Sequence, residues 1–107
     1  MERRANIVRL RPGMEGRYRE LHAAVWPEVR AAMERAQMTN YTIFYRDGLL
    51  VSYFEYTGTD FERDREVMAA QPEVQRWWAL TAPCQERLET AGRGQLWVPA
   101  EELFHLD

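Results

Sequence analysis

The chain has 107 residues and a mass of 12.7 kDa, the size of one domain with one hydrophobic core. Apolar residues make up 46% and charged residues 29%, so the composition is that of a globular protein and excludes a disordered one. The formal net charge is −3 and every basic residue is an arginine, without the cluster of positive charge that a nucleic-acid partner requires.

The first third of the chain predicts a strand followed by an interrupted helix. Residues 5–11 form a short apolar run that ends at Pro12-Gly13, which predicts a strand. Residues 14–36 then show apolar positions at helical spacing. Because proline removes a helical N–H donor and disfavours the α conformation of the preceding residue, we expect a break or kink at Pro27. One continuous helical face carries Tyr18, Leu21, His22, Val25, Trp26 and Val29.

The middle of the chain predicts a β-hairpin. Residues 40–46 and 49–56 are two β-prone runs separated only by Asp47-Gly48, which indicates a two-residue type I′ turn. One face of the paired strands would carry Tyr41, Ile43, Tyr45, Leu50, Ser52, Phe54 and Tyr56, and the other Thr42, Phe44, Val51 and Tyr53. Both faces are apolar and aromatic, and the helices of so short a chain can cover only one. A second copy of the chain is therefore expected to cover the other.

The rest of the chain predicts two helices and short extended pieces. One helix is expected over residues 60–70, with Thr59 or Asp60 as its N-cap, and the next from Pro72 to a stop at Pro83. After them, residues 84–87 look helical, Gly92 and Gly94 mark a loop, and residues 96–98 and 102–106 are candidate strands. The order strand, helix, hairpin, helix, strand indicates a ferredoxin-like α+β fold, an antiparallel sheet with helices on one face, over residues 1–107.

Few side chains in this sequence suit catalysis. A Gly-rich phosphate loop, a cysteine pair and a helix with two histidines at metal-ligand spacing are all missing, and the single serine, Ser52, lies in mid-strand. His22 lies on the apolar face of the first helix and is a candidate for proton transfer near neutral pH, the alternative being a buried structural histidine. His105 is interpreted as structural, and the two histidines offer no third ligand for a zinc ion.

Aromatic side chains with polar ends predict a cavity for a small ligand. Trp77 and Trp78 would point about 100° apart on a helix, so at most one faces the deep core while the other lines an edge or cleft. Core packing of both is the alternative. Tyr41 would place its hydroxyl group in the same space as His22. Aromatic walls with neutral hydrogen-bonding groups suit a neutral polyol better than a phosphate or a carboxylate.

These residues are similar to the motifs of the L-rhamnose mutarotase family. The matching motifs are Tyr18-x-x-x-His22-x-x-x-Trp26-Pro27-Glu28, Asn40-Tyr41, Gln75-Arg76-Trp77-Trp78 and Glu102-Leu103-Phe104-His105-Leu106. They follow in the same order and with nearly the same spacing, and they extend over nearly the whole chain. The Trp-Pro-Glu and Arg-Trp-Trp blocks are specific when they occur together.

The resemblance implies a fold, an activity and a set of site residues. It implies a dimeric α/β barrel of two ferredoxin-like protomers whose sheets face each other. It also implies interconversion of the α and β anomers of L-rhamnose or a related 6-deoxyhexose by acid/base ring opening and closing, without a metal or an organic cofactor. The proton donor would be His22, and the substrate contacts would come from Tyr18, Tyr41, Trp77 and Trp78.

Two other functions stay open from the sequence. A cofactor-free monooxygenase on the same dimeric α/β-barrel fold would also use a cavity lined by histidine, tryptophan and asparagine. A non-catalytic ligand-sensing dimer module would use the cavity for binding alone, since a fold does not fix a function. Acceleration of anomer exchange in free sugars would distinguish a mutarotase from these two alternatives.

The sequence also predicts a cytoplasmic protein without a membrane partner. Cys84 is the single cysteine, so no disulfide can form within the chain and a reducing compartment is expected. The longest uncharged stretches, such as residues 77–85, are far too short to span a bilayer. The N-terminal residues lack the apolar core of a signal peptide.

Overall fold

The sheet is built around β1 (Glu2–Leu10), which has a neighbour on each side. β3 (Leu49–Tyr56) pairs with one side of β1, and the short strands β4 (Gln85–Glu86) and β5 (Val98–Ala100) pair with the other. β2 (Met38–Arg46) pairs with β3, so the order is β2-β3-β1-β4 and every pairing is antiparallel. This strand order is that of the ferredoxin-like fold, which confirms the predicted architecture.

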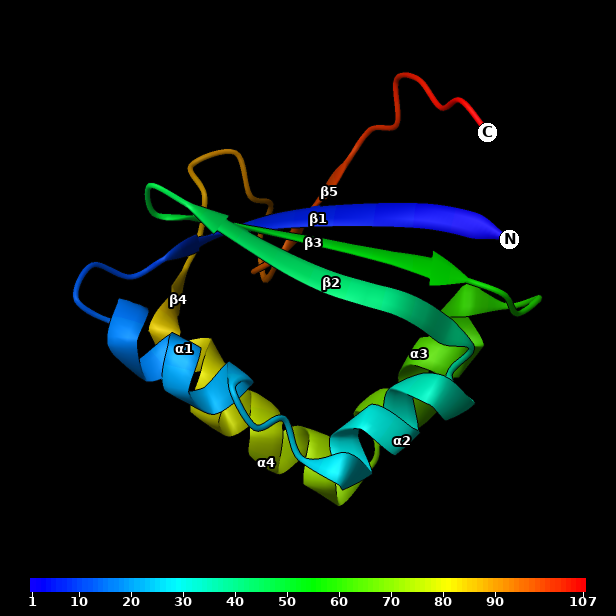
Figure 1. The fold of residues 1–107 in the computed structure, drawn as a ribbon, viewed down its shortest axis with the longest axis horizontal. Helices are drawn as coiled ribbons and strands as arrows, with labels where there is room; N and C mark the ends of the chain where they lie inside the picture. The colour runs from blue at the N-terminus through cyan, green and yellow to red at the C-terminus, as the bar shows by residue number, and fades with distance from the viewer.

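Four α-helices cover one face of this sheet in the computed structural model, which describes residues 1–107. They are α1 (Glu15–His22), α2 (Pro27–Arg35), α3 (Phe61–Ala69) and α4 (Pro72–Thr81). Helices α1 and α4 lie below one end of the sheet and α2 and α3 below the other, so that the helical layer has the shape of a V (Figure 1). None of the helices has the length and apolar character needed to cross a membrane.

The predicted break at Pro27 is confirmed and produces two helices. α1 ends at His22, and Pro27 is the first residue of α2. Trp26 between them has φ −58° and ψ 135°, an extended conformation, because the proline ring disfavours the helical one. His22 therefore lies at the end of a helix and not in the middle of one.

The turn and pairing of the hairpin are also as predicted. Arg46 pairs with Leu49, and Asp47 and Gly48 have positive φ values of 47° and 83°, as a type I′ turn requires. Every second residue of β3 is buried against the helices, namely Leu50, Ser52, Phe54 and Tyr56. The predicted division of the hairpin into two faces is therefore correct.

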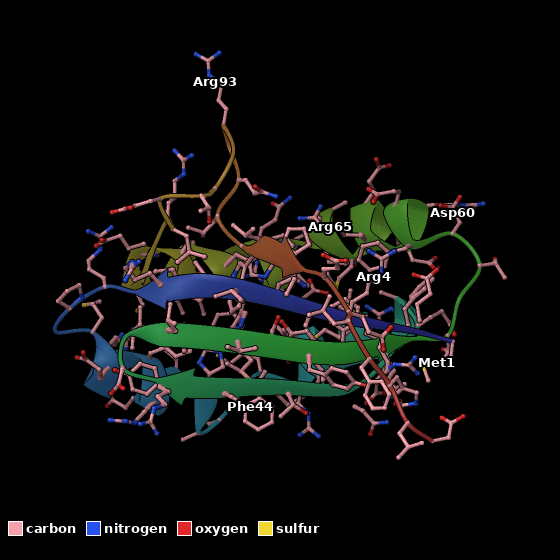
Figure 2. The ribbon with its side chains drawn as sticks, turned by 90° about the horizontal axis from the view of Figure 1, so that it is seen from above. Met1, Arg4, Phe44, Asp60, Arg65 and Arg93 are labelled. Atoms are coloured by element: carbon pink, nitrogen blue, oxygen red, sulfur yellow. The ribbon has the colours of Figure 1, made fainter.

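The outer face of the sheet is apolar and is left uncovered by a single chain. Phe44 is 61% exposed and pairs with Val51, which lies opposite Ile7 of β1. Tyr53 lies opposite Ala5 in the same pairing. Figure 2 is seen from this side and shows Phe44 along the β2 edge. The helices contribute nothing to this face.

Two predictions near the C-terminus are wrong. Residues 84–87 are not helical: they contain the end of a 3₁₀ turn and β4. The cause is a long-range pairing, since the Arg11 N–H donates to the Cys84 carbonyl oxygen at 2.8 Å and ties this segment to the end of β1. Residues 102–106 form no strand, and the last strand, β5, begins at the end of the predicted range 96–98.

Replacement by alanine should have opposite effects on the free energy of unfolding at two of the glycines. A Cβ atom at Gly48 would meet nothing within 4 Å, but the φ of 83° is strained for alanine, so Gly48→Ala should lower the free energy of unfolding by about 1 kcal/mol. A Cβ atom at Gly16 in α1 would also meet nothing within 4 Å, and its φ is not positive. Gly16→Ala should therefore raise the free energy of unfolding by up to about 1 kcal/mol. Urea unfolding followed by circular dichroism measures both, and effects of the same sign would contradict the assignment.

Candidate active site

A cavity of about 1350 Å³ lies between the helices and the helix-facing side of the sheet. Its walls come from all four helices and the loop before β5, and its floor comes from the strands. The five residues that the sequence predicted for the site all line this cavity: Tyr18, His22, Tyr41, Trp77 and Trp78. The fold thus brings together residues from α1, β2 and α4 that are far apart in the sequence.

His22 lies in the cavity with one ring nitrogen already engaged. Its Nδ1 is 3.0 Å from the backbone carbonyl oxygen of Tyr18, one helical turn earlier. Because a carbonyl oxygen can only accept a hydrogen bond, Nδ1 carries a proton, and in the neutral imidazole Nε2 is the free acceptor. The Tyr18 ring stacks on the imidazole with centroids 4.1 Å apart, and Trp77 meets it edge-on at 5.4 Å. Nε2 is therefore the atom available for proton transfer.

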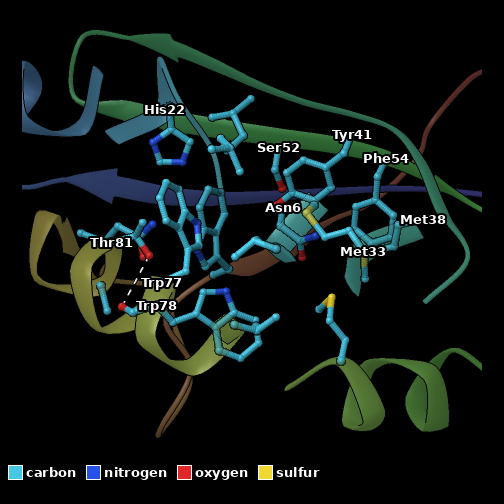
Figure 3. A pocket seen from close by; sticks show the side chains of 18 of the residues that line it. Asn6, His22, Met33, Met38, Tyr41, Ser52, Phe54, Trp77, Trp78 and Thr81 are labelled. Atoms are coloured by element: carbon cyan, nitrogen blue, oxygen red, sulfur yellow. Dashed lines mark hydrogen bonds between the residues drawn. The ribbon is translucent and has the colours of Figure 1, made fainter. Parts of the chain in front are cut away.

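The neighbouring tryptophans differ in exposure, as predicted. Trp77 is 6% exposed and packs edge-on against Trp26, with ring centroids 5.2 Å apart. Trp78 is 37% exposed and lines the cavity from the same helix (Figure 3). Trp77 therefore supports the wall that holds His22, whereas Trp78 keeps an open indole surface for a ligand.

The two tyrosines enter the cavity as neutral hydroxyl groups. Burial raises the pKa of Tyr18 to about 12, although a hydrogen bond with the Gln85 side chain acts in the opposite direction. Tyr41 stacks on Phe54 with ring centroids 5.5 Å apart. Tyr41 as a whole is 40% exposed, but its hydroxyl group is buried. This burial raises the pKa of Tyr41, and the nearby Ser52 side chain partly lowers it again. Both phenols act as hydrogen-bond donors and acceptors, not as bases.

Sequence analysis missed several polar residues of the cavity. Asn6, Ser52, Thr81 and Gln85 line it as well. Ser52 was set aside as a mid-strand residue, yet the alternation of β3 turns it toward the cavity with 2% exposure. A polar residue at a helix-facing position of an apolar strand was the signal that pointed to Asn6 and Ser52. Gln85 gave no such signal, because a helix was expected over residues 84–87.

This arrangement can bind a neutral ring with many hydroxyl groups and move one proton. It combines an imidazole with a free Nε2, two neutral phenols and an open indole surface. No group of three or more histidine, cysteine, aspartate or glutamate side chains is placed to hold a metal ion. On this ferredoxin-like fold, such a site suits an isomerase that acts on carbohydrates by proton transfer.

Known proteins match the chain along its whole length. The family model described as L-rhamnose mutarotase matches residues 3–106. An L-rhamnose mutarotase from Phocaeicola vulgatus is 31% identical over 107 residues, which is 100% of both chains, and one from Sinorhizobium fredii is 33% identical over 108 residues, which is 99% of both. The chain belongs to the L-rhamnose mutarotase family.

A solved structure agrees with this assignment at the level of the fold. The crystal structure of an L-rhamnose mutarotase from Formosa agariphila matches with a TM-score of 0.79 over 100% of both chains, at 23% sequence identity. The predicted family, fold class and enzyme class, a carbohydrate isomerase, are therefore confirmed. Anomer interconversion is favoured over the monooxygenase and the ligand-sensing module. The roles of individual side chains stay predictions.

Burial of Tyr18 predicts a loss of stability at alkaline pH. Its pKa is about 12 in the folded protein against 10 for an ordinary tyrosine, so the folded state holds this proton more tightly. Its contribution to the free energy of unfolding should be complete below about pH 10 and should fall as the pH rises toward 12. Denaturant titrations across this range should show a shallower decline for Tyr18→Phe than for the wild type. Equal slopes would contradict the prediction.

Proposed function

We propose that this protein interconverts the α and β anomers of L-rhamnose and that His22 is its proton-transfer group. The observation that carries the proposal is the hydrogen bond from His22 Nδ1 to the Tyr18 carbonyl oxygen, which leaves Nε2 as the reactive atom of a cavity with aromatic walls. The relatives named L-rhamnose mutarotase support the choice of sugar. The whole chain acts as one domain, and its single free cysteine suits a cytoplasmic location.

Ring opening needs two proton movements, and His22 supplies one of them. The imidazolium form donates its Nε2 proton to the ring oxygen as the C1–O5 bond breaks. The anomeric hydroxyl group loses its proton to water, and the electrons of its O–H bond form the carbonyl group at C1. After rotation about C1–C2, the reverse steps close the ring on the other face of the carbonyl, and neutral Nε2 takes the proton back.

The remaining residues of the predicted site bind and orient the sugar. The neutral phenols of Tyr18 and Tyr41 exchange hydrogen bonds with its hydroxyl groups. The open indole of Trp78 stacks on the apolar side of the ring, including the C6 methyl group, and such a contact contributes about 1–3 kcal/mol by analogy with base stacking. Trp77 contacts the sugar along the edge that faces His22.

Replacement of His22 should remove most of the catalysis. His22→Ala should slow anomer exchange by about 10²–10⁴-fold, the usual contribution of a positioned proton-transfer group. Binding should survive, since the tyrosines and tryptophans remain. Two-dimensional exchange NMR on L-rhamnose measures the rate. The control is His105→Ala, because His105 is the other histidine of the chain and pairs with Asp107 at 2.7 Å.

The outcome that contradicts this role is equally definite. A folded His22→Ala protein that exchanges anomers within about threefold of the wild type would exclude His22, since that ratio corresponds to roughly 0.65 kcal/mol. A similar loss in His105→Ala would show that the effect is not specific to the cavity.

We also propose a homodimer joined through the outer face of the sheet. This face carries Thr42, Phe44, Val51 and Tyr53. The last residues of the chain extend on the same side (Figure 1), where Leu103, Phe104 and Leu106 are 87%, 81% and 79% exposed. So much apolar surface is unusual for a monomer. A second copy related by a two-fold axis would cover both regions.

A charge on this face should break the dimer. Phe44→Glu should give a monomer or an unfolded chain, because it would bury an unpaired carboxylate. The control is Val67→Glu, which changes an apolar residue of α3 that is 57% exposed on the helical side and should leave the dimer intact. Size-exclusion chromatography with light scattering measures both. A wild-type protein that is a stable monomer at micromolar concentration would contradict the dimer.

A further inference from the structure

Asn6 and Ser52 are uncharged polar side chains on the largely apolar helix-facing side of the sheet, and the mechanism above uses neither of them. Asn6 of β1 and Ser52 of β3 lie directly opposite each other in the strand pairing. Three of their four nearest neighbours on the same face are apolar, namely Val8, Leu50 and Phe54, which are 0%, 1% and 4% exposed. The fourth is Arg4, whose guanidinium lies over the Phe61 ring. The strand alternation therefore places an uncharged polar pair within a largely apolar surface.

Both side chains face the cavity, where Figure 3 shows them beside Tyr41. Ser52 is buried, and its hydroxyl group is close enough to that of Tyr41 to oppose the rise in the pKa of this tyrosine. Asn6 is half-buried, and no protein group hydrogen-bonds its carboxamide. No buried polar side-chain atom of the protein lacks a partner, so the Asn6 carboxamide is open to the cavity. A carboxamide offers two N–H donors and one acceptor oxygen, and here all three are available to a ligand.

We propose that Asn6, supported by Ser52, is a specificity-determining residue that binds the hydroxyl groups at C3 and C4 of the sugar. The inference rests on the proposed function, in which the C1–O5 bond faces Nε2 of His22 in α1. Asn6 reaches the cavity from the sheet and not from the helices (Figure 3). In a pyranose the C3–C4 bond lies across the ring from C1–O5. A sugar that presents its reacting edge to His22 thus turns its C3–C4 edge toward Asn6.

The chemistry of the carboxamide suits two adjacent hydroxyl groups. Its N–H donates to one hydroxyl oxygen while its carbonyl oxygen accepts from the neighbouring hydroxyl. Ser52 and Tyr41 form the hydroxyl pair next to it and complete a polar floor. An indole wall accepts any ring with an apolar face. A hydrogen-bonding group distinguishes sugars more strongly, because a sugar that lacks the hydroxyl group leaves the protein's donor or acceptor without a partner.

The test compares anomer exchange of L-rhamnose with that of its 3-deoxy and 4-deoxy analogues. The wild type should favour L-rhamnose over at least one analogue by about tenfold or more in kcat/KM. Asn6→Ala should lose most of this preference, chiefly through a raised KM, with kcat for L-rhamnose within about threefold because His22 is intact. The control is Gln71→Ala, which removes another carboxamide that bonds the Val67 carbonyl oxygen at 3.2 Å. It should keep the wild-type preference.

Two further variants test the same inference if Asn6→Ala does not fold. Asn6→Asp keeps the size and the acceptor oxygen but removes both N–H donors, and Ser52→Ala removes the supporting hydroxyl group. Each should reduce the preference in the same way. A folded Asn6 variant with the full wild-type preference overturns the inference.

A wild type that does not accelerate anomer exchange of L-rhamnose contradicts the proposed function instead. In that case NMR titration of the same three sugars decides the role of Asn6 separately. Weaker binding of the deoxy analogues by the wild type, but not by Asn6→Ala, would support hydroxyl recognition. Equal discrimination by both proteins would overturn it.

Discussion

A proline inside a helical pattern separates two of the four helices that form the layer below the sheet. Pro27 disfavours a helical conformation at Trp26 and so interrupts the helical pattern of residues 14–36. The extended conformation that the proline imposes on Trp26 separates the two helices, and these become parts of opposite limbs of the V. The cavity lies between those limbs and the strands, so the space for a ligand depends on this interruption.

The electrostatic character of the cavity follows from what its floor and walls contain. Burial keeps the phenols of Tyr18 and Tyr41 neutral over a wide pH range. The polar floor is likewise uncharged, since Asn6 and Ser52 supply an amide and a hydroxyl group. His22 is thus the candidate among them for proton transfer, through its free Nε2. Charged side chains line other parts of the cavity, on α2, α3 and the loop before β5: Arg30, Glu34, Arg65 and Arg93. In the proposed function, binding and proton transfer are carried by different side chains, so each is expected to be altered without the other.

Local patterns in the sequence predicted most of this fold, and long-range pairings explain the errors. Asp47-Gly48 and Pro27 act on their own neighbours, so the turn and the helix break could be predicted from them. Trp77 is buried and Trp78 is partly exposed, as expected for consecutive residues of a helix, which point in different directions. Residues 84–87 were misassigned because their conformation depends on β1, more than seventy positions earlier. Asn6 gave a local signal as a polar residue in an apolar strand, but its position opposite Ser52 is fixed only by the pairing of β1 with β3.

The hairpin serves two surfaces through residues that alternate along the same strand. In β3, Ser52 faces the cavity while Val51 and Tyr53 on either side of it face outward. A shift of the strand by one residue would exchange the two sets completely. A single substitution in the hairpin strands therefore changes one face or the other, but a single-residue insertion or deletion would disrupt both surfaces together. Its length is constrained more tightly than its composition.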